Sequence, residues 1–292
     1  MNKNWIKENI HTYWKIYTLF TLFVCVIAVL FFVFQTHERP LRVAFLDVGQ
    51  GDAIFIESPT GNQVVIDGGP GSALVSKVAA QMPLIDRSID MIIVTNPDRD
   101  HFEGFIPLLS RYDVEAVLEP GVKADNNPIY QEFKRILMEQ EVPVLVARTG
   151  QKILLGGGAY IDIIFPDRDV EDVSHNEGSL VARLVYKDTS IMLTGDTTKN
   201  IEQYIVNQYK EYLDADILKV AHHGSDTSTG DEFVKAVSPE VAIISAGKDN
   251  SYGHPKQATL DTLHKNNVET LVTMDEGTIV FESDGKVFKR RK

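Results

Sequence analysis

Downstream of residue 40, short apolar runs alternate with polar segments rich in Gly, Pro, Asp and Asn. Apolar runs of this length, rich in Val, Ile, Leu and Phe, predict buried β-strands. We expect strands at 41–47, 53–57, 63–67, 91–94, 159–165, 180–186, 190–193, 217–221, 241–245, 270–273 and 278–282.

Helices are expected between these strands, where a capping or first-turn residue begins a longer segment. The segments are 72–82, 128–139, 198–209, 230–237 and 256–266. Strand pairs joined by tight turns and interrupted by helices predict a mixed α/β fold, with two sheets packed face to face and helices outside. The order of the layers does not follow from the pattern.

Residues 16–34 differ from the rest of the chain because they form an uncharged apolar run. At about 1.5 Å per residue, a helix of this length reaches roughly across the hydrocarbon core of a bilayer. A cleaved signal peptide is the alternative, but its apolar core is shorter and is followed by small residues, whereas Phe34 is followed by Gln-Thr-His-Glu. We therefore expect an uncleaved single-pass membrane anchor that contacts the lipid bilayer.

The flanking charges favour one orientation of this anchor. Three lysines precede it and two arginines follow it (Lys3, Lys7 and Lys15, then Arg39 and Arg42). The positive-inside rule then puts the short tail inside and the main domain outside the cytoplasm. We expect a tail and anchor at 1–40, a domain at 41–285 and a basic tail at 286–292.

The charge of the main domain limits its partners. The whole chain carries a net charge of -12, and because residues 1–40 contribute +2, the remainder carries -14. Such an acidic domain is a poor non-specific nucleic-acid binder, since neutralising phosphates requires Lys and Arg. The basic residues at 286–292 are a local exception that fits a solubilising tail as well as a binding role. The only cysteine, Cys25, lies in the apolar run, so no disulfide is expected in the domain.

Candidate chemistry follows the predicted strand at 91–94, in the sequence Asn96-Pro97-Asp98-Arg99-Asp100-His101. The ends of buried strands are where open α/β sheets place their functional groups. An acidic turn that caps a helix is the alternative interpretation. Two carboxylates and an imidazole crowded together would repel or demand partners, so the pattern favours a metal site.

Further ligand-type residues stand next to other predicted strands: Asp196, the pair His222-His223, His254 and His175. Singly, Asp196 could cap a helix and His254 could be an ordinary loop residue. The two adjacent histidines are expected to point to opposite sides of their strand. Together, Asp and His at the ends of several strands predict one metal site.

The residue types narrow the metal and the chemistry. Imidazole and carboxylate without thiolate suit Zn²⁺, Mn²⁺ or Fe²⁺, and the share of carboxylates makes Mn²⁺ a strong option. Two such ions can clamp a phosphoryl oxygen and lower the pKa of a bound water. The sequence contains no G-x-S-x-G, P-loop or dinucleotide-binding glycine motif, which leaves the corresponding enzyme classes unsupported.

Five segments then carry a family resemblance: Phe45 to Ala53, Val65 to Gly69, Leu193 to Asp196, Leu218 to Ser225 and Gly247 to Pro255. In this order they resemble the metallo-β-lactamase-fold domain of ComEC-type DNA-uptake competence proteins, over residues 41–285. The resemblance implies a four-layer αββα sandwich with its metal site at one edge of the two sheets. It also implies a nuclease or phosphodiesterase that uses Zn²⁺ or Mn²⁺, with two ions per chain.

The resemblance also assigns roles residue by residue. It implies that Asp100, His101, Asp196 and His223 hold one ion. Asp196 would bridge to a second ion, whose other ligands would be Asp98 and His175. Catalysis would use Asp100, His222 and His254, and the substrate would contact Asn96, Ser225 and Lys248.

The chain departs from the family at two points. Asn96 stands where the family has a histidine, so the ion beside it would be loose, bound only with substrate, or absent. Complete ComEC-type proteins carry a many-helix channel, whereas one span is expected here, so DNA transport by this chain alone is not expected. We expect a membrane-anchored phosphodiester hydrolase that acts on DNA or on a small envelope phosphodiester, which the acidic domain fits better. The rival is a non-catalytic accessory or binding protein that kept the fold.

Overall fold

The computed structural model describes residues 3–36 and 39–291, with side chains for 13–29 and 39–291. The chain divides into two compact units, Met1–Arg39 and Pro40–Lys292. In the first unit, α1 (Lys3–Thr36) contains the apolar run at 16–34. Among the residues described, no helix is both long enough and apolar enough to cross a membrane. The anchor expected at 16–34 is therefore not confirmed.

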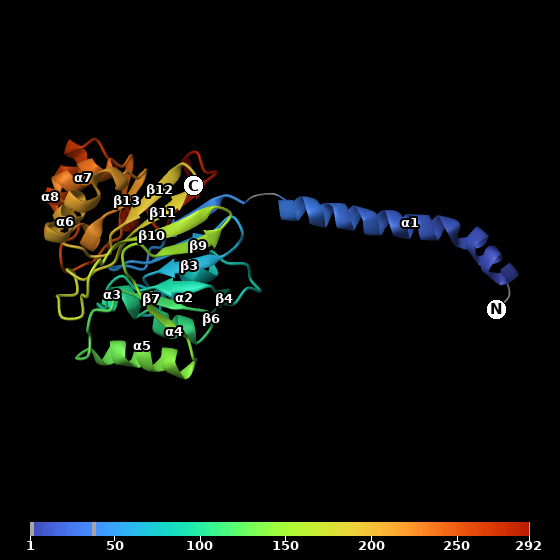
Figure 1. Cartoon of the computed structure of the whole chain (residues 1–292), viewed down its shortest axis with the longest axis horizontal. Coiled ribbons are helices and arrows are strands. Elements are labelled where there is room, and N and C mark those ends of the chain that lie inside the picture. Colours follow the sequence, from blue (N-terminus) through green and yellow to red (C-terminus); the bar gives the residue numbers. More distant parts are fainter. Residues whose placement is uncertain (1–2, 37–38, 292) are drawn as a thin grey trace. The chain divides into compact units, whose positions relative to one another are not determined.

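The second unit contains two large sheets with helices on their outer faces (Figure 1). The eight-stranded sheet has the order β17-β16-β1-β2-β3-β5-β7-β8, and the seven-stranded sheet has the order β15-β14-β13-β12-β11-β10-β9. The strands of the first sheet are β1 (Leu41–Phe45), β2 (Ile54–Glu57), β3 (Gln63–Ile66), β5 (Met91–Ile93), β7 (Val117–Glu119), β8 (Val144–Val146), β16 (Ile279–Ser283) and β17 (Phe288–Arg291). Those of the second are β9 (Lys152–Gly156), β10 (Ala159–Phe165), β11 (Val181–Tyr186), β12 (Thr189–Leu193), β13 (Ile217–Lys219), β14 (Val241–Ile244) and β15 (Glu269–Val272). A small separate pair joins β4 (Ser88–Ile89) to β6 (Asp113–Val114).

Each large sheet is antiparallel in one part and parallel in the other. In the first sheet β1, β2 and β3 are antiparallel, and β5, β7 and β8 follow β3 in parallel. In the second, β10, β11 and β12 are antiparallel, and β13, β14 and β15 follow in parallel. Parallel neighbours need crossover connections, which explains why helices interrupt the second part of each sheet.

The helices form the two outer layers. The first sheet is covered by α2 (Ala73–Ala79), α3 (Arg99–Phe102), α4 (Phe105–Leu109) and α5 (Pro128–Glu139). The second is covered by α6 (Lys199–Tyr209), α7 (Asp231–Val237) and α8 (Gln257–Lys265), as Figure 1 shows. Shorter helical turns are η1 (Lys210–Tyr212), η2 (Ala221–Gly224) and α9 (Thr273–Glu276).

Side-chain burial matches four layers. Side chains such as Val43, Phe45, Ile161 and Leu184 fill one core between the two sheets. A second core lies between the first sheet and its helices, and a third lies between the second sheet and its helices. Strands buried on both faces need apolar residues at nearly every position, which is why they are read as continuous apolar runs. The expected mixed α/β fold with two sheets and outer helices is confirmed.

Three edge strands, β8, β9 and β17, fall in segments for which no strand was predicted. Residues 288–291 lie inside the expected basic tail, yet β17 pairs antiparallel with β16 and Phe288 packs against the central core. The expectation of a tail outside the domain is therefore wrong for these residues. Charged side chains on an edge strand keep it from pairing with other chains, which accounts for a basic sequence in a sheet.

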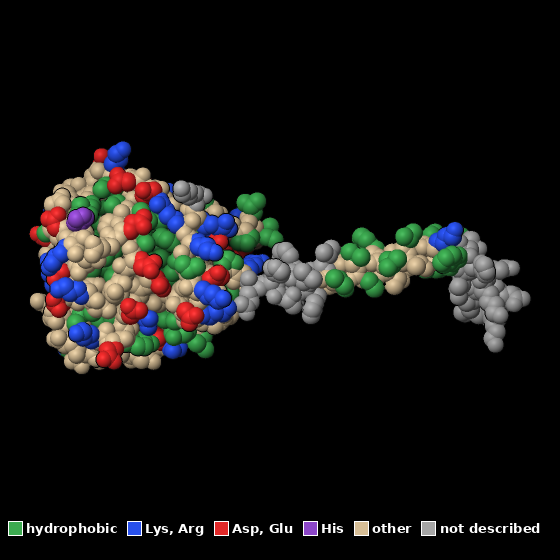
Figure 2. Space-filling view, turned by 90° about the horizontal axis from the view of Figure 1, so that it is seen from above, with side chains coloured by type: hydrophobic (Ala, Val, Ile, Leu, Met, Phe, Trp, Pro, Cys, Tyr) green, Lys and Arg blue, Asp and Glu red, His purple; other side chains and the backbone are tan. Residues whose placement is uncertain are grey.

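The surface of the domain mixes both signs of charge. Figure 2 shows acidic and basic side chains interspersed on one face of the chain. Many of the basic groups are paired with carboxylates, as Lys235 is with Asp231 and Glu232 on α7. Such pairing leaves little free positive charge on these side chains for phosphate groups.

Candidate metal centre

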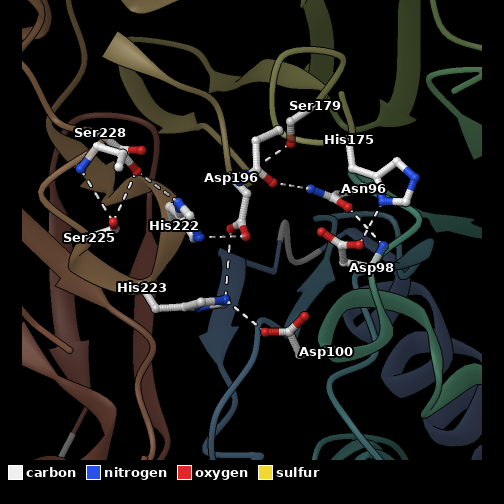
Figure 3. A network of polar contacts seen from close by, with 12 residues as sticks. Asn96, Asp98, Asp100, His175, Ser179, Asp196, His222, His223, Ser225 and Ser228 are labelled. Atoms are coloured by element: carbon white, nitrogen blue, oxygen red, sulfur yellow. Dashed lines mark hydrogen bonds and ion pairs between the residues drawn. The ribbon is translucent and has the colours of Figure 1, made fainter. Parts of the chain in front are cut away.

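Loops from both sheets meet at one edge and bring together the side chains drawn in Figure 3. Asp67 follows β3, Asp100 and His101 lie on α3 after β5, and Asp196 follows β12. His222 and His223 lie in η2, directly after β13. These are the carboxyl ends of strands in the parallel parts of the two sheets, where α/β folds place ligand sites.

His101 is fully buried between two carboxylates. Its Nδ1 lies 2.8 Å from Asp67 Oδ2, and its Nε2 lies 3.1 Å from Asp196 Oδ2. Asp67 is itself held by Thr95, whose backbone N–H and hydroxyl donate hydrogen bonds of 2.7 and 2.6 Å. Asp67 therefore orients the ring so that Nε2 faces Asp196.

His223 is held in the same way from the other sheet. Its Nδ1 donates to the backbone carbonyl of Ser245 at 3.0 Å and lies 3.2 Å from Asp52 Oδ1. Its Nε2 lies 3.2 Å from Asp100 Oδ2 and 3.8 Å from Asp196 Oδ1. Because a carbonyl acceptor fixes the proton on Nδ1, the neutral ring presents an unprotonated Nε2 to the two carboxylates.

Behind His223, Asp52 forms a buried ion pair with Lys219. Lys219 Nζ lies 2.7 Å from Asp52 Oδ2, and the two side chains are 1% and 3% exposed. Lys219 lies on β13 of one sheet, whereas Asp52 lies between β1 and β2 of the other. The pair therefore links the two sheets directly behind a candidate ligand.

Both histidines of η2 have left-handed backbone conformations, with φ of 51° for His222 and 53° for His223. Non-glycine residues rarely adopt this conformation, and it is most often kept where a site needs it. It turns both rings toward Asp196, since His222 Nε2 lies 3.8 Å from Asp196 Oδ2. The expectation that the two rings point to opposite sides is wrong, because the chain has left the strand before it reaches them.

The buried polar atoms at the centre of the cluster fit a metal ion. His101 Nε2, His223 Nε2 and Asp196 Oδ1 are buried and have no hydrogen-bond partner among the residues described. Ligand atoms of Asp100, His101 and His223 lie within 4.8 Å of one another, and so do those of Asp52, Asp196 and His223. Polar atoms without a hydrogen-bond partner are costly in a protein interior, and a divalent cation satisfies nitrogen and carboxylate lone pairs together. The chemistry of the donors therefore fits the ion.

The protonation behaviour also shows that the cluster favours positive charge. Burial by itself lowers the pKa of His223, but the Asp196 and Asp52 carboxylates outweigh it and raise that pKa to about 10. Burial likewise lowers the pKa of His101, but the Asp196 and Asp67 carboxylates outweigh it and hold that pKa well above the usual value. Conversely, burial opposes ionisation of Asp196, but His101 and His223 hold its pKa well below the usual range. A cation of either kind, proton or metal, is thus stabilised here.

The residues expected to hold a second ion interact mainly with one another. Asn96 is fully buried, donates to Asn176 Oδ1 at 3.0 Å and accepts from the backbone N–H of Asp98 at 2.7 Å. His175 has Nδ1 2.6 Å from Asp98 Oδ1 and Nε2 3.2 Å from the carbonyl of Lys123. Asp98 and His175 belong to none of the ligand clusters found among the residues described. The second site therefore stays a prediction.

Some of the residues expected to act in catalysis or to contact substrate line the cleft, and others do not. His222 and His254 line the cleft, with ring centroids 5.8 Å apart. Burial, with His223 and His222 nearby, lowers the pKa of His254 to about 4. Ser225 Oγ is engaged with Thr227 Oγ1 at 2.9 Å, whereas Lys248 is exposed and is not among the residues that line the cleft.

The cleft over this cluster has a volume of about 340 Å³. It is lined by Gln50, Asp98, Arg99, Asp100, Asp196, His222, His223, Tyr252 and His254.

Sequence reasoning missed two of the buried carboxylates, Asp67 and Asp52. Asp67 is the last residue of a predicted strand and precedes two glycines, so the signal that singled out Asp196 could have found it. Asp52 gave no such signal, because its partner Lys219 lies far away in the sequence.

Curated relatives of the chain are competence proteins. The chain is 30% identical to "ComE operon protein 3" of Bacillus subtilis (strain 168), over 90% of this chain and 36% of that protein. It is 26% identical to "Competence protein ComA" of Neisseria gonorrhoeae, over 84% of this chain and 32% of that protein. The chain thus spans about a third of the length of these relatives.

Solved structures share the fold at low sequence identity. One is the crystal structure of CmlA, a diiron beta-hydroxylase from Streptomyces venezuelae, with a TM-score of 0.50 and 16% identity. The likeness covers 80% of this chain and 53% of that one. The sequence profile of the metallo-beta-lactamase superfamily matches residues 46–248. This range includes the ligand cluster but not the loop that carries Tyr252 and His254. With this match, the two-sheet fold and the competence-protein relatives, the chain belongs to the metallo-beta-lactamase superfamily.

Proposed function

We propose that the chain is a metal-dependent hydrolase of phosphodiester bonds. The observation that carries this proposal is the convergence of His101, Asp196 and His223, whose buried ring nitrogens and carboxylate oxygens face one another below an open cleft. Asp100 completes the set from the cleft side, with a side chain 31% exposed. A buried ligand set under a solvent-accessible cleft suits catalysis better than a purely structural metal site.

In this proposal Asp100, His101, Asp196 and His223 hold a Zn²⁺ or Mn²⁺ ion. When bound, such an ion supplies Lewis acidity toward a phosphoryl oxygen and lowers the pKa of a water. A second ion would use Asp98 and His175, with Asp196 as the bridge. Its binding would require His175 to exchange its present hydrogen bonds for the metal.

The remaining residues of the cleft act directly on the substrate in this proposal. Asp100 orients the attacking water by accepting its hydrogen bond. His254 has a buried Nδ1 without a hydrogen-bond partner among the residues described, and its lowered pKa keeps the ring neutral at neutral pH. A neutral imidazole can donate a hydrogen bond to a phosphate oxygen, whereas His222, beside Asp196, is placed to protonate the leaving oxygen.

DNA is the substrate that the resemblance to competence proteins suggests, and a smaller phosphodiester is the alternative that the acidic domain favours. Attachment to a membrane through residues 16–34, with the domain outside the cytoplasm, is also part of the proposal. It is supported by the apolar run and by the flanking lysines. These features specify where the enzyme would meet its substrate and do not affect the chemistry.

The test combines metal content with turnover in one matched pair of variants. Asp196→Asn removes a central carboxylate, whereas Asp188→Asn changes an exposed aspartate at the opposite end of β12. We expect the purified wild type and Asp188→Asn to bind Mn²⁺ or Zn²⁺ and to hydrolyse methyl p-nitrophenyl phosphate. Asp196→Asn should lose the metal and about a hundredfold or more of the rate. Hydrolysis that survives Asp196→Asn, or a wild type that binds no metal, would contradict the proposal.

A further inference from the structure

The loop that carries His254 is held rigidly by one asparagine. Asn250 Nδ2 donates to the carbonyls of Gly247 at 2.7 Å and His254 at 2.8 Å. Its Oδ1 accepts from the backbone N–H of His254 at 2.8 Å. At the tip of the loop, Lys256 Nζ donates to the carbonyl of Tyr252 at 2.5 Å. Each end of the segment between these residues is thus fixed, and the side chain of Tyr252 is presented from a defined backbone.

The Tyr252 ring rests on the His254 ring and faces solvent. The two centroids are 5.7 Å apart with an interplanar angle of 23°, which is a stacked arrangement. Tyr252 is nevertheless 63% exposed, so the ring face away from His254 is open. Tyr252 also lines the cleft above Asp196 and His223. The contact with His254 uses one face of the ring, and its other face, at the rim of the cleft, packs against nothing in the described domain that would explain its exposure.

We propose that Tyr252 is a stacking platform for a nucleobase next to the phosphodiester group in the cleft. The inference rests on the proposed function and names the substrate class, a nucleotide diester. Every nucleobase has a flat π-face, so one exposed aromatic ring can stack on any base, whatever the sequence of the nucleic acid. The order of the rings supports this placement. The ring centroids of His223, a proposed metal ligand, and His254 lie 6.5 Å apart, and the Tyr252 ring stacks on His254 as the next ring outward.

Stacking also reconciles nucleotide binding with the negative charge of the domain. A domain with a charge of -14 has few free basic groups for phosphates, but stacking does not need them. A quaternary ammonium group is the other ligand that a tyrosine face could attract. It is disfavoured here because Tyr252 is the only aromatic residue besides histidines among those lining the cleft, and Arg99 lies on the same rim.

The experiment compares Tyr252→Leu and Tyr252→Phe with a control at the other exposed tyrosine of the described domain, Tyr212→Leu. Binding of a fluorescent phosphorothioate thymidine oligonucleotide, which resists hydrolysis, is measured with Mn²⁺ present. An abasic oligonucleotide of the same length is measured in parallel. Tyr252→Leu should weaken binding of the thymidine oligonucleotide by about 5- to 150-fold, in keeping with the loss of one stacked base. Tyr252→Phe and Tyr212→Leu should leave it unchanged, and the abasic oligonucleotide should respond to none of the variants.

Hydrolysis of methyl p-nitrophenyl phosphate by the same proteins separates this inference from the proposed function. That ester has no base, so Tyr252→Leu should lose much less of this activity than of its affinity for the thymidine oligonucleotide, and the control Tyr212→Leu should hydrolyse the ester as the wild type does. A wild type that fails to hydrolyse it would contradict the proposed function, while the binding measurement would still report on Tyr252. The stacking inference is overturned if the oligonucleotide does not bind, if both oligonucleotides weaken equally, or if Tyr252→Leu instead weakens binding of a choline phosphodiester.

Discussion

At the scale of single residues, the least expected group in the domain is the ammonium of Lys219, which is buried in a β-strand behind the candidate metal centre. Its pairing with Asp52 predicts that Lys219→Met destabilises the fold by about 3–5 kcal/mol, because an unpaired buried carboxylate remains. Urea unfolding followed by circular dichroism measures this change. Lys235→Met, which breaks exposed ion pairs on α7, should cost far less, because exposed ion pairs contribute little to stability.

The double variant Asp52→Asn with Lys219→Met checks the explanation, since it removes both charges and should recover part of the lost stability. A Lys219→Met protein as stable as Lys235→Met would show that the pair does not hold the sheets together.

Asp52→Asn alone should also weaken metal binding by about 10–100-fold, because Asp52 lies beside the Nδ1 of His223.

The same residues show how far sequence reasoning reaches into the site. Asp100, His101, Asp196 and His223 could be predicted because each stands beside an apolar strand, and the structure brings them together. Lys219 could not, because it lies inside an apolar strand and its charge makes sense only once Asp52 is placed against it. The hydrogen bond between Asn96 and Asn176 was equally beyond reach, since it depends on the paths of two loops that are far apart in the sequence.

At the scale of elements, the turn between β1 and β2 packs against α3, and two of its glycines make a matched pair. A Cβ on Gly51 would lie 2.4 Å from the carbonyl oxygen of Asp100, whereas a Cβ on Gly49 would meet nothing within 4 Å. Both have positive φ, at 133° and 85°, so both substitutions by alanine strain the backbone. Gly49→Ala should therefore cost about 1 kcal/mol, and Gly51→Ala more than that.

Only Gly51→Ala should also weaken metal binding, because it pushes α3 and with it Asp100 away from His223. Isothermal titration with Mn²⁺ or Zn²⁺, together with thermal unfolding, distinguishes the two effects. Equal losses of stability and of metal affinity in both variants would mean that the close approach to Asp100 has no special role.

The elements that the sequence did not reveal are mostly those at the edges of the sheets. Most strands buried on both faces were found, and β10 has the predicted bounds 159–165. One exception is β7, which is buried at all three of its positions and was not predicted. By contrast, β8 is exposed at two of its three positions and β17 at three of four, so neither forms an apolar run. Helix α5 also has its predicted bounds, because Asn127 caps it by accepting from the backbone N–H groups of Ile129 and Tyr130. The pattern thus predicted elements that bury apolar faces or begin with a cap.

At the scale of the whole molecule, the histidines of the centre should make stability depend on pH when no metal is bound. In the unfolded chain a histidine has a pKa of about 6.5, whereas His223 in the folded protein has a pKa of about 10. A raised pKa means that the folded state binds the proton more tightly. Its contribution to stability is therefore full below about pH 6.5 and is lost progressively as the pH rises toward 10. His101, whose pKa is also raised, acts in the same direction.

A bound divalent ion takes the place of these protons, so it should remove this loss of stability. In the presence of a chelator, the free energy of unfolding by urea should fall between about pH 7 and about pH 9, and saturating Zn²⁺ should flatten the slope. His223→Gln should show a smaller slope in chelator, because it removes one of the two titrating rings. A metal-free wild type whose stability stays constant over this range would contradict the prediction. Because the cluster joins loops from both sheets, the same measurement shows how strongly the charge at this edge stabilises the whole domain.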